Sequence, residues 1–137
     1  MTCSTVTSSK TFIAGSADGR IVAFTNEGDA TPLSGEQHSG YVSGITSTPN
    51  STWSVGYDDR VRTITSDLRG SSGMPTTSQP KAVAAGGDDL AFVAESNSIE
   101  VFKNGSKVST VSIKYEAVSV AVSAAGIVAV GAQVRLP

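Results

Sequence analysis

A pattern that recurs about every 40 residues is the feature of this 137-residue chain that most limits its possible folds. Four segments share an apolar run, a polar turn and a second apolar run: FIAGSADGRIVAF (12–24), WSVGYDDRVRTI (53–64), AFVAESNSIEVF (91–102) and IVAVGAQVRL (127–136). Aligning them superposes Ile21, Val61, Ile99 and Val134, at steps of 40, 38 and 35 residues. A regular period of this length is typical of repeat proteins, in which each repeat is one small supersecondary unit.

The apolar runs predict β-strands. They are short, they are rich in Val, Ile, Phe and Thr, and turn-forming residues separate them. A further strand is expected before each later repeat, in 41–47, 81–85 and 117–123, and Asn104-Gly105 predicts a hairpin that leads into 107–113. Four strands in about 40 residues are typical of a β-propeller blade. A β-sandwich of the immunoglobulin type also has closely spaced strands, but it does not explain the repeat.

We therefore expect an all-β fold of antiparallel four-stranded sheets in four units, 1–33, 34–75, 76–113 and 114–137. About three and a half units are fewer than the roughly four blades of the smallest propellers, so we expect a partial β-propeller whose first and last units are incomplete. The last repeat also lacks the Asp-Gly turn expected between Gly131 and Val134. Exposed sheet flanks predict that the isolated chain self-associates.

The neighbouring aspartates Asp58-Asp59 allow two interpretations, a functional carboxylate pair or a tight turn. They stand at the same point of their repeat as Asp18-Gly19 and Ser96-Asn97, between two strands. Short polar side chains favour such turns because they bond to their own backbone, so a turn is the better interpretation. A metal site would need further ligands, and the sequence has neither an EF-hand spacing nor a His/Cys cluster.

Charge and motifs argue against several classes of function. Ten Lys and Arg against 12 Asp and Glu, without a basic cluster, predict no nucleic-acid or membrane partner, and no apolar run reaches the ~18 residues of a membrane span. The single histidine, His38, is accompanied by no nucleophile motif or phosphate loop, so we expect no enzyme activity, cofactor or metal. One cysteine, Cys3, and no apolar leader predict a cytoplasmic protein.

The repeats resemble WD repeats. A blade of that family has a Gly-His-like dipeptide before its first strand, a Ser or Thr in the second, an Asp in the next turn and a Trp in the third. In this chain His38, Ser54 and Asp58 stand at the first three positions, and Ile64 stands at the Trp position. The resemblance implies that His38, Ser54 and Asp58 form a structural hydrogen-bonded group, which ends at the serine and stiffens its unit.

Over nearly the whole chain, the repeats and their order resemble the actin-interacting protein 1 family, most clearly in DDRVR followed by QPKAVA. The resemblance implies a scaffold that binds actin filaments and cofilin and promotes the disassembly of cofilin-decorated filaments, at the cytoskeleton. A WD-repeat adaptor for another complex is an alternative, and so is a propeller enzyme whose catalytic residues lie outside this sequence. Four residues are candidate protein contacts, although a solvated turn would also explain them: Tyr57, Asp59, Arg60 and Arg62.

Overall fold

The computed structural model describes residues 1–86 and 89–133, and these residues form strands, turns and no helix. The first sheet has the antiparallel order β1-β2-β3-β4. Its strands are β1 (Cys3–Val6), β2 (Phe12–Gly15), β3 (Ile21–Phe24) and β4 (Ala30–Pro32). We expected this unit to be incomplete, but it has four strands. A turn closed by a 3.0 Å hydrogen bond from the Gly28 N–H to the Thr25 carbonyl folds β4 back onto β3.

The second sheet departs from the expected four strands. Its main strands, which pair antiparallel in chain order, are β6 (Val42–Ser47), β7 (Thr52–Gly56) and β8 (Arg60–Ile64). Three two-residue strands flank them: β5 (Ser34–Gly35), β9 (Arg69–Gly70) and β10 (Met74–Pro75). β9 and β10 both pair with β8, and β5 runs parallel to β9. The outer strand is split because Gly73, with φ of 72°, turns the chain between β9 and β10.

The third sheet has the expected four antiparallel strands, in the order β11 (Ala82–Gly86), β12 (Leu90–Ala94), β13 (Ser98–Lys103) and β14 (Ser106–Ser112). The hairpin predicted at Asn104-Gly105 is confirmed. Lys103 pairs with Ser106, and the two turn residues have φ of 52° and 78°. Positive φ at both central residues is what a two-residue type I′ turn requires, because its twist then matches that of the strands.

The fourth sheet consists, in the described part of the chain, of β15 (Glu116–Val122) and β16 (Val128–Gln133). β16 continues through Gly131 without a turn, and the aligned residue Val134 lies outside the described residues. The other three aligned residues, Ile21, Val61 and Ile99, are all buried at the start of the strand that follows the repeated turn. The turns at 18–19, 58–59 and 96–97 lie between strands, as the sequence predicted.

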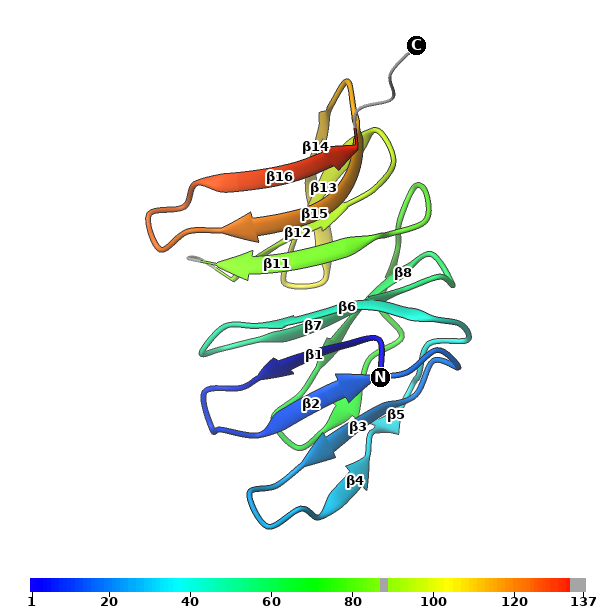
Figure 1. Ribbon diagram of the computed structural model, residues 1–137, viewed down its shortest axis with the longest axis vertical. Helices are drawn as coiled ribbons and strands as arrows, with labels where there is room; N and C mark the ends of the chain where they lie inside the picture. The colour runs from blue at the N-terminus through cyan, green and yellow to red at the C-terminus, as the bar shows by residue number, and fades with distance from the viewer. Residues whose placement is uncertain (87–88, 134–137) are drawn as a thin grey trace.

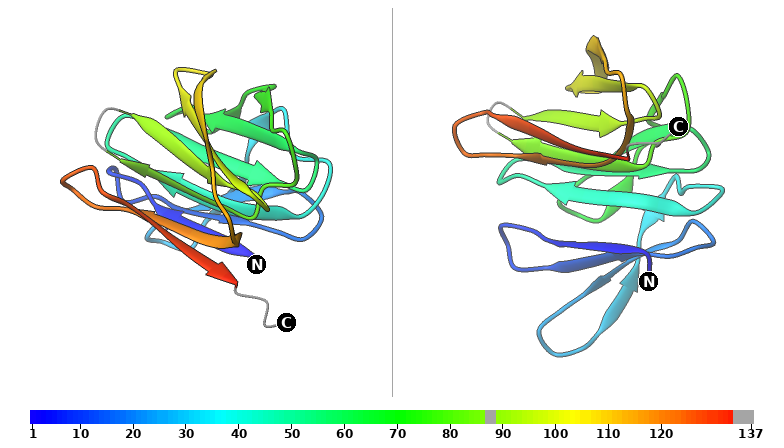
Figure 2. Two further views of the ribbon diagram at one scale, coloured as in Figure 1. Left: turned by 90° about the horizontal axis from the view of Figure 1, so that it is seen from above. Right: turned by 45° about the horizontal axis from the view of Figure 1, so that its top comes forward.

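The sheets follow one another as layers, and their first strands, β1, β6, β11 and β15, lie next to each other (Figure 1). The right-hand view of Figure 2 shows the same succession from another side. Glycines permit this close approach. A Cβ on Gly15 would lie 2.7 Å from Val42 Cγ1, and one on Gly86 would lie 2.6 Å from Val122 Cγ1. Since real Cβ atoms do not come this close to a side chain, a larger residue would push the sheets apart.

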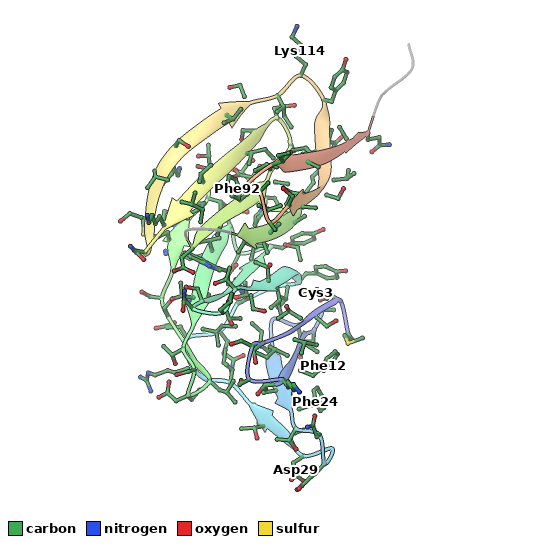
Figure 3. The ribbon with its side chains drawn as sticks, turned by 90° about the vertical axis from the view of Figure 1, so that its left-hand side faces the viewer. Cys3, Phe12, Phe24, Asp29, Phe92 and Lys114 are labelled. Atoms are coloured by element: carbon green, nitrogen blue, oxygen red, sulfur yellow. The ribbon has the colours of Figure 1, made fainter. Side chains whose placement is uncertain are left out.

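Strand β7 is buried along its whole length, because a sheet packs on each side of it. Its side chains alternate between the two faces, as those of any strand do. Trp53 and Val55 join a core with Phe102 and other residues of the third sheet. A separate core lies between the first two sheets and includes Ile13 and Ile64. The first sheet also carries the aromatic pair Phe12 and Phe24, whose ring centroids are 5.9 Å apart (Figure 3).

Phe102→Ala should lower the free energy of unfolding by about 3–5 kcal/mol, because it leaves a cavity in the core between the second and third sheets. The Phe102 side chain is fully buried. Val111→Ala on β14 is the control, since Val111 is 53% exposed and its loss should change stability by less than about 0.5 kcal/mol. Urea unfolding measures both variants. Equal losses would show that this core does not hold the two sheets together.

Candidate functional site

The His38 side chain lies in the connection between β5 and β6 and is completely buried. Its Nδ1 is 2.8 Å from Asp58 Oδ1, and its Nε2 is 2.9 Å from Ser54 Oγ. The structure thus brings together the three residues that the WD-like spacing selected. Gly56, at the end of β7, makes room for the ring, because a Cβ there would lie 2.6 Å from His38 Nδ1.

The charges of this group follow from its surroundings. Burial lowers the pKa of His38 and outweighs the opposite effect of Asp58, so the imidazole is neutral. Burial favours protonation of Asp58, but hydrogen bonds from His38, the Ser39 N–H and Arg62 lower its pKa overall. A neutral imidazole donates from one nitrogen and accepts at the other. His38 therefore donates from Nδ1 to the Asp58 carboxylate and accepts the Ser54 hydroxyl proton at Nε2.

Arg62 was expected to be an exposed contact residue, and this expectation is wrong. Only 8% of Arg62 is exposed. Arg62 on β8 is paired with Ser54 on β7, so its side chain points to the same buried face of the sheet as that of Ser54. Its guanidinium donates to the carbonyls of Ser71 and Ser72, both at 2.9 Å, and to Asp58 Oδ2 at 3.3 Å. Arg62 therefore extends the buried group from Asp58 to the segment between β9 and β10.

The order of bonds from Ser54 through His38 to Asp58 is that of a hydrolase catalytic triad. Access differs, however. Ser54 is 0% exposed in the middle of β7, so a substrate carbonyl has no path to its hydroxyl. This arrangement joins the connection before β6 to the turn between β7 and β8. Its three hydrogen-bonded side chains are suited to hold these two loops together, and not to attack a substrate.

A second buried polar group, which the sequence analysis missed, holds the equivalent connection of the third sheet. Glu95 Oε1 accepts hydrogen bonds from the N–H and hydroxyl of Ser78, at 2.7 and 3.0 Å. Glu100 accepts from the Thr77 N–H at 2.7 Å and forms an ion pair with Lys107. Both glutamates are 0% exposed. The sequence did contain a signal for this group. One glutamate stands on each side of the turn at 96–97, whereas the other repeats have no glutamate at these positions.

Two buried carboxyl groups with one lysine cannot both be ionised at low cost. Burial and the neighbouring Glu100 raise the pKa of Glu95 to about 8. Burial acts the same way on Glu100, but hydrogen bonds from Glu95, Lys107 and Thr77 bring its pKa to about 2. Glu95 is therefore the protonated partner and donates to Glu100.

Two exposed tyrosines lie directly beside the His38 group. The rings of Tyr41 and Tyr57 are stacked, with centroids 4.9 Å apart and planes at 26°, and the two residues are 38% and 45% exposed. Their backbones are joined by a 2.8 Å hydrogen bond from the Tyr57 N–H to the Tyr41 carbonyl. Asp59, in the same turn, is also exposed, whereas Arg60 is half-buried and donates to the Gly73 carbonyl. Tyr57 and Asp59 are thus the exposed contact candidates.

Among residues 1–86 and 89–133, no three His, Cys, Asp or Glu side chains come together in a way that could hold a metal ion. The same residues include no helix long and apolar enough to cross a membrane.

No protein-family model matches the chain. A solved streptogramin B lyase superposes on 94% of this chain and 47% of its own, with a TM-score of 0.81 at 20% identity. Virginiamycin B lyase from Staphylococcus aureus superposes on 95% of this chain and 54% of its own, with a TM-score of 0.74 at 15% identity. The chain has a β-propeller-like fold. At these identities the likeness concerns the fold alone.

One curated protein is similar in sequence. The 66 kDa stress protein of Physarum polycephalum is 36% identical over an alignment of 132 residues, and the alignment covers 93% of this chain and 22% of that protein. The chain therefore spans about a fifth of the length of this relative.

His38→Ala should lower the free energy of unfolding by about 1–3 kcal/mol, because it leaves the Ser54 hydroxyl and Asp58 Oδ1 buried without that partner. Since folding lowers the pKa of His38 from 6.5, the unfolded chain binds more protons just below that pH. Stability should therefore fall as the pH is lowered from about 6.5.

The control is His38→Gln, which keeps a polar side chain but does not titrate. Urea unfolding at pH 7.5 and pH 5 should show a smaller loss on acidification for His38→Gln than for the unchanged chain. The same loss in both would mean that His38 is not the group that titrates.

Glu95→Gln should stabilise the chain at alkaline pH. Because folding raises the pKa of Glu95 from 4.5 to about 8, the folded chain holds the extra proton between these values, and stability is lost as the pH rises through that range. A glutamine amide donates to Glu100 without needing a proton. At pH 9 the free energy of unfolding of Glu95→Gln should therefore exceed that of the unchanged chain by at least about 1 kcal/mol. Glu27→Gln, at an exposed position, is the control. If the stability of Glu95→Gln declined from pH 5.5 to 9 as much as that of the unchanged chain, Glu95 would not be the group that titrates.

Proposed function

We propose that this chain is part of a WD-repeat β-propeller scaffold that binds a protein partner through the corner formed by Tyr41 and Tyr57. The observation that carries the proposal is the stacked pair of exposed rings on two loops that a buried hydrogen-bonded group holds in place. Tyrosines are enriched at the centres of protein interfaces, because they contribute a large contact area at a small entropic cost. Rings that are already ordered lose even less freedom on binding.

The WD assignment is supported by the His38, Ser54 and Asp58 group, which has the spacing and bonding order of that family. The chain departs from the family at Ile64, which is buried in the core between the first two sheets instead of donating a hydrogen bond. Arg62, on the same strand, adds a donor at the opposite end of the group, because it bonds to Asp58. A WD blade with this added bond keeps the rigid corner that a scaffold needs.

For the partner, we propose actin filaments decorated with cofilin, whose disassembly the complete protein would promote in the cytoplasm, at the cytoskeleton. The support is the resemblance of the repeat order, with DDRVR and QPKAVA, to the actin-interacting protein 1 family. A WD-repeat adaptor for another protein complex remains the alternative, since it would use the same corner. A net charge of −2 without a basic cluster favours a protein over a nucleic acid or a membrane.

We also propose that the chain acts by binding and not by catalysis. The triad-like arrangement of Ser54, His38 and Asp58 is buried at Ser54. The carboxyl pair of Glu95 and Glu100 is equally closed to solvent.

Cosedimentation with actin filaments, with and without cofilin, tests the partner. Binding through one corner should be weak, because the full contact surface of a propeller is assembled from loops of several units. It should also require cofilin, because the proposed partner is the cofilin-decorated filament. The double variant Tyr41→Ala/Tyr57→Ala should lose at least about tenfold in affinity, the effect of about 1.4 kcal/mol. Tyr115→Ala is the matched control, since Tyr115 is 56% exposed on a different unit. Equal affinities of the two variants would exclude the tyrosine corner as the binding surface. If the chain did not bind filaments at all, the alternative function as an adaptor for another complex would be favoured.

Light scattering on the same samples tests the expected self-association of the isolated chain. The fourth sheet exposes Val118 and Ile127, at 45% and 69%, and a paired surface would bury them. A monodisperse monomer would contradict this expectation.

A further inference from the structure

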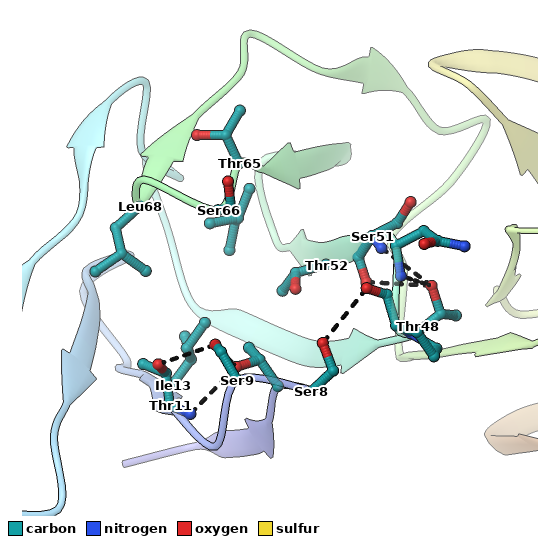
Figure 4. A pocket seen from close by; sticks show the side chains of 14 residues that line it. Ser8, Ser9, Thr11, Ile13, Thr48, Ser51, Thr52, Thr65, Ser66 and Leu68 are labelled. Carbon is teal, nitrogen blue, oxygen red and sulfur yellow. Dashed lines mark hydrogen bonds between the residues drawn. The ribbon is translucent and has the colours of Figure 1, made fainter.

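A pocket of about 160 Å³ opens between the first and second sheets, where three turns meet (Figure 4). The turns are 7–11 between β1 and β2, 48–52 between β6 and β7, and 64–68 between β8 and β9. Strand β7 begins at this pocket and ends at the His38 group, so the pocket lies at the opposite end of the sheet from the tyrosine corner.

Hydroxyl groups dominate the wall of the pocket. Nine of the 14 residues that line it are Ser or Thr, and none is Asp, Glu, Lys, Arg or His. A charged ligand would lose its hydration without meeting an opposite charge, which is unfavourable. A hydroxyl both donates and accepts hydrogen bonds, so a wall of hydroxyls is complementary to a ligand with the same dual capacity.

Thr52, at the start of β7, has a free hydroxyl at the bottom of this wall. The residue is 8% exposed, yet no hydrogen bond among the described residues involves its side chain. Figure 4 shows it between the turn at Thr65–Leu68 and the turn at Ser8–Thr11. Ser66, across the pocket, is exposed, and its hydroxyl has no partner in the described part of the chain. Because the Thr52 hydroxyl oxygen still reaches the open space of the pocket, it can bond to a bound molecule there.

Other hydroxyls hold the rim in shape. Thr7 Oγ1 and Ser9 Oγ are 2.9 Å apart, and Thr48 Oγ1 accepts hydrogen bonds from the N–H groups of Asn50 and Ser51, at 3.3 and 3.1 Å. These bonds lie within single turns, so they order the rim before a ligand arrives. A rim ordered in advance reduces the entropic cost of binding.

The floor of the pocket is apolar and is formed by Ile13, Ile64 and Leu68. Ile13 and Ile64 belong to the core between the first two sheets, and Leu68 packs against it. The pocket therefore presents hydroxyls around its wall and hydrocarbon at its base. A cyclic polyol or a sugar ring has the matching surfaces, hydroxyls at its edge and C–H groups on its faces.

From these features we infer that the pocket binds a small uncharged polyhydroxyl ligand. Its volume is below the roughly 300–1,000 Å³ of pockets for drug-sized molecules, so it accepts no more than one sugar ring. Thr52 and Ser66 supply the hydrogen bonds that orient the ring, and the three apolar side chains cover one of its faces. This site is independent of the proposed tyrosine corner, and either can fail without the other.

The test is ¹H–¹⁵N NMR of the full chain titrated with myo-inositol and D-glucose, with glucose 6-phosphate as a charged counterpart. Saturable shifts should be confined to residues 7–11, 48–52 and 64–68 for the two neutral probes. The phosphorylated probe should bind more weakly, because no cation lines the pocket. Thr52→Val keeps the shape and removes the hydroxyl, so it should weaken binding roughly five- to tenfold.

Ser66→Ala is a second variant at an exposed position, where the fold is not at risk, and it should also weaken binding. Thr110→Val, on the exposed strand β14, is the matched control and should leave binding unchanged. The inference is overturned if the neutral probes cause no saturable shifts, if the phosphorylated probe binds more tightly, or if neither Thr52→Val nor Ser66→Ala weakens binding.

Discussion

The close packing of consecutive sheets along their first strands is the constraint on which the rest of the structure depends. Gly15 faces Val42 and Gly86 faces Val122, at distances that leave no space for another carbon atom. This contact brings the apolar faces of neighbouring sheets together, so that each pair of sheets encloses a core of its own. Because the cores are small and local, each unit depends mainly on its neighbours, as in other repeat proteins.

Each connection into a first strand must also be fixed, and the chain does this with two different kinds of chemistry. Before β6 a neutral histidine joins a carboxylate and a serine, with Arg62 balancing the charge. Before β11 a protonated glutamate shares its proton with an ionised one, and Lys107 balances the charge. Both groups are buried and nearly neutral overall, which is the condition under which buried polar groups rigidify a structure without a large desolvation cost.

The two ends of β7 consequently have different properties. At one end the His38 group holds loops that present stacked tyrosines to solvent, which suits a large partner with an aromatic or basic surface. At the other end three turns enclose a neutral, hydroxyl-lined pocket, which suits a small molecule. A single strand thus connects the proposed contact surface with the proposed ligand site, because its two ends meet different sets of loops.

Local patterns in the sequence by themselves determined the longer strands, the repeated turns, the Asn104-Gly105 hairpin and the spacing of His38, Ser54 and Asp58, but not the short strands β4, β5, β9 and β10. These features depend on neighbours along the chain or on a repeat that aligns distant segments. Only the tertiary structure decided that Arg62 is buried, that the outer strand of the second sheet is split, and that Glu95 and Glu100 share a proton. The physical reason is that burial and charge depend on which sheet covers a given face. An alternating strand such as RVRTI is the same in sequence whether its arginines face water or other protein groups, and the segment between β9 and β10, with Asp58, is what gave Arg62 its buried role.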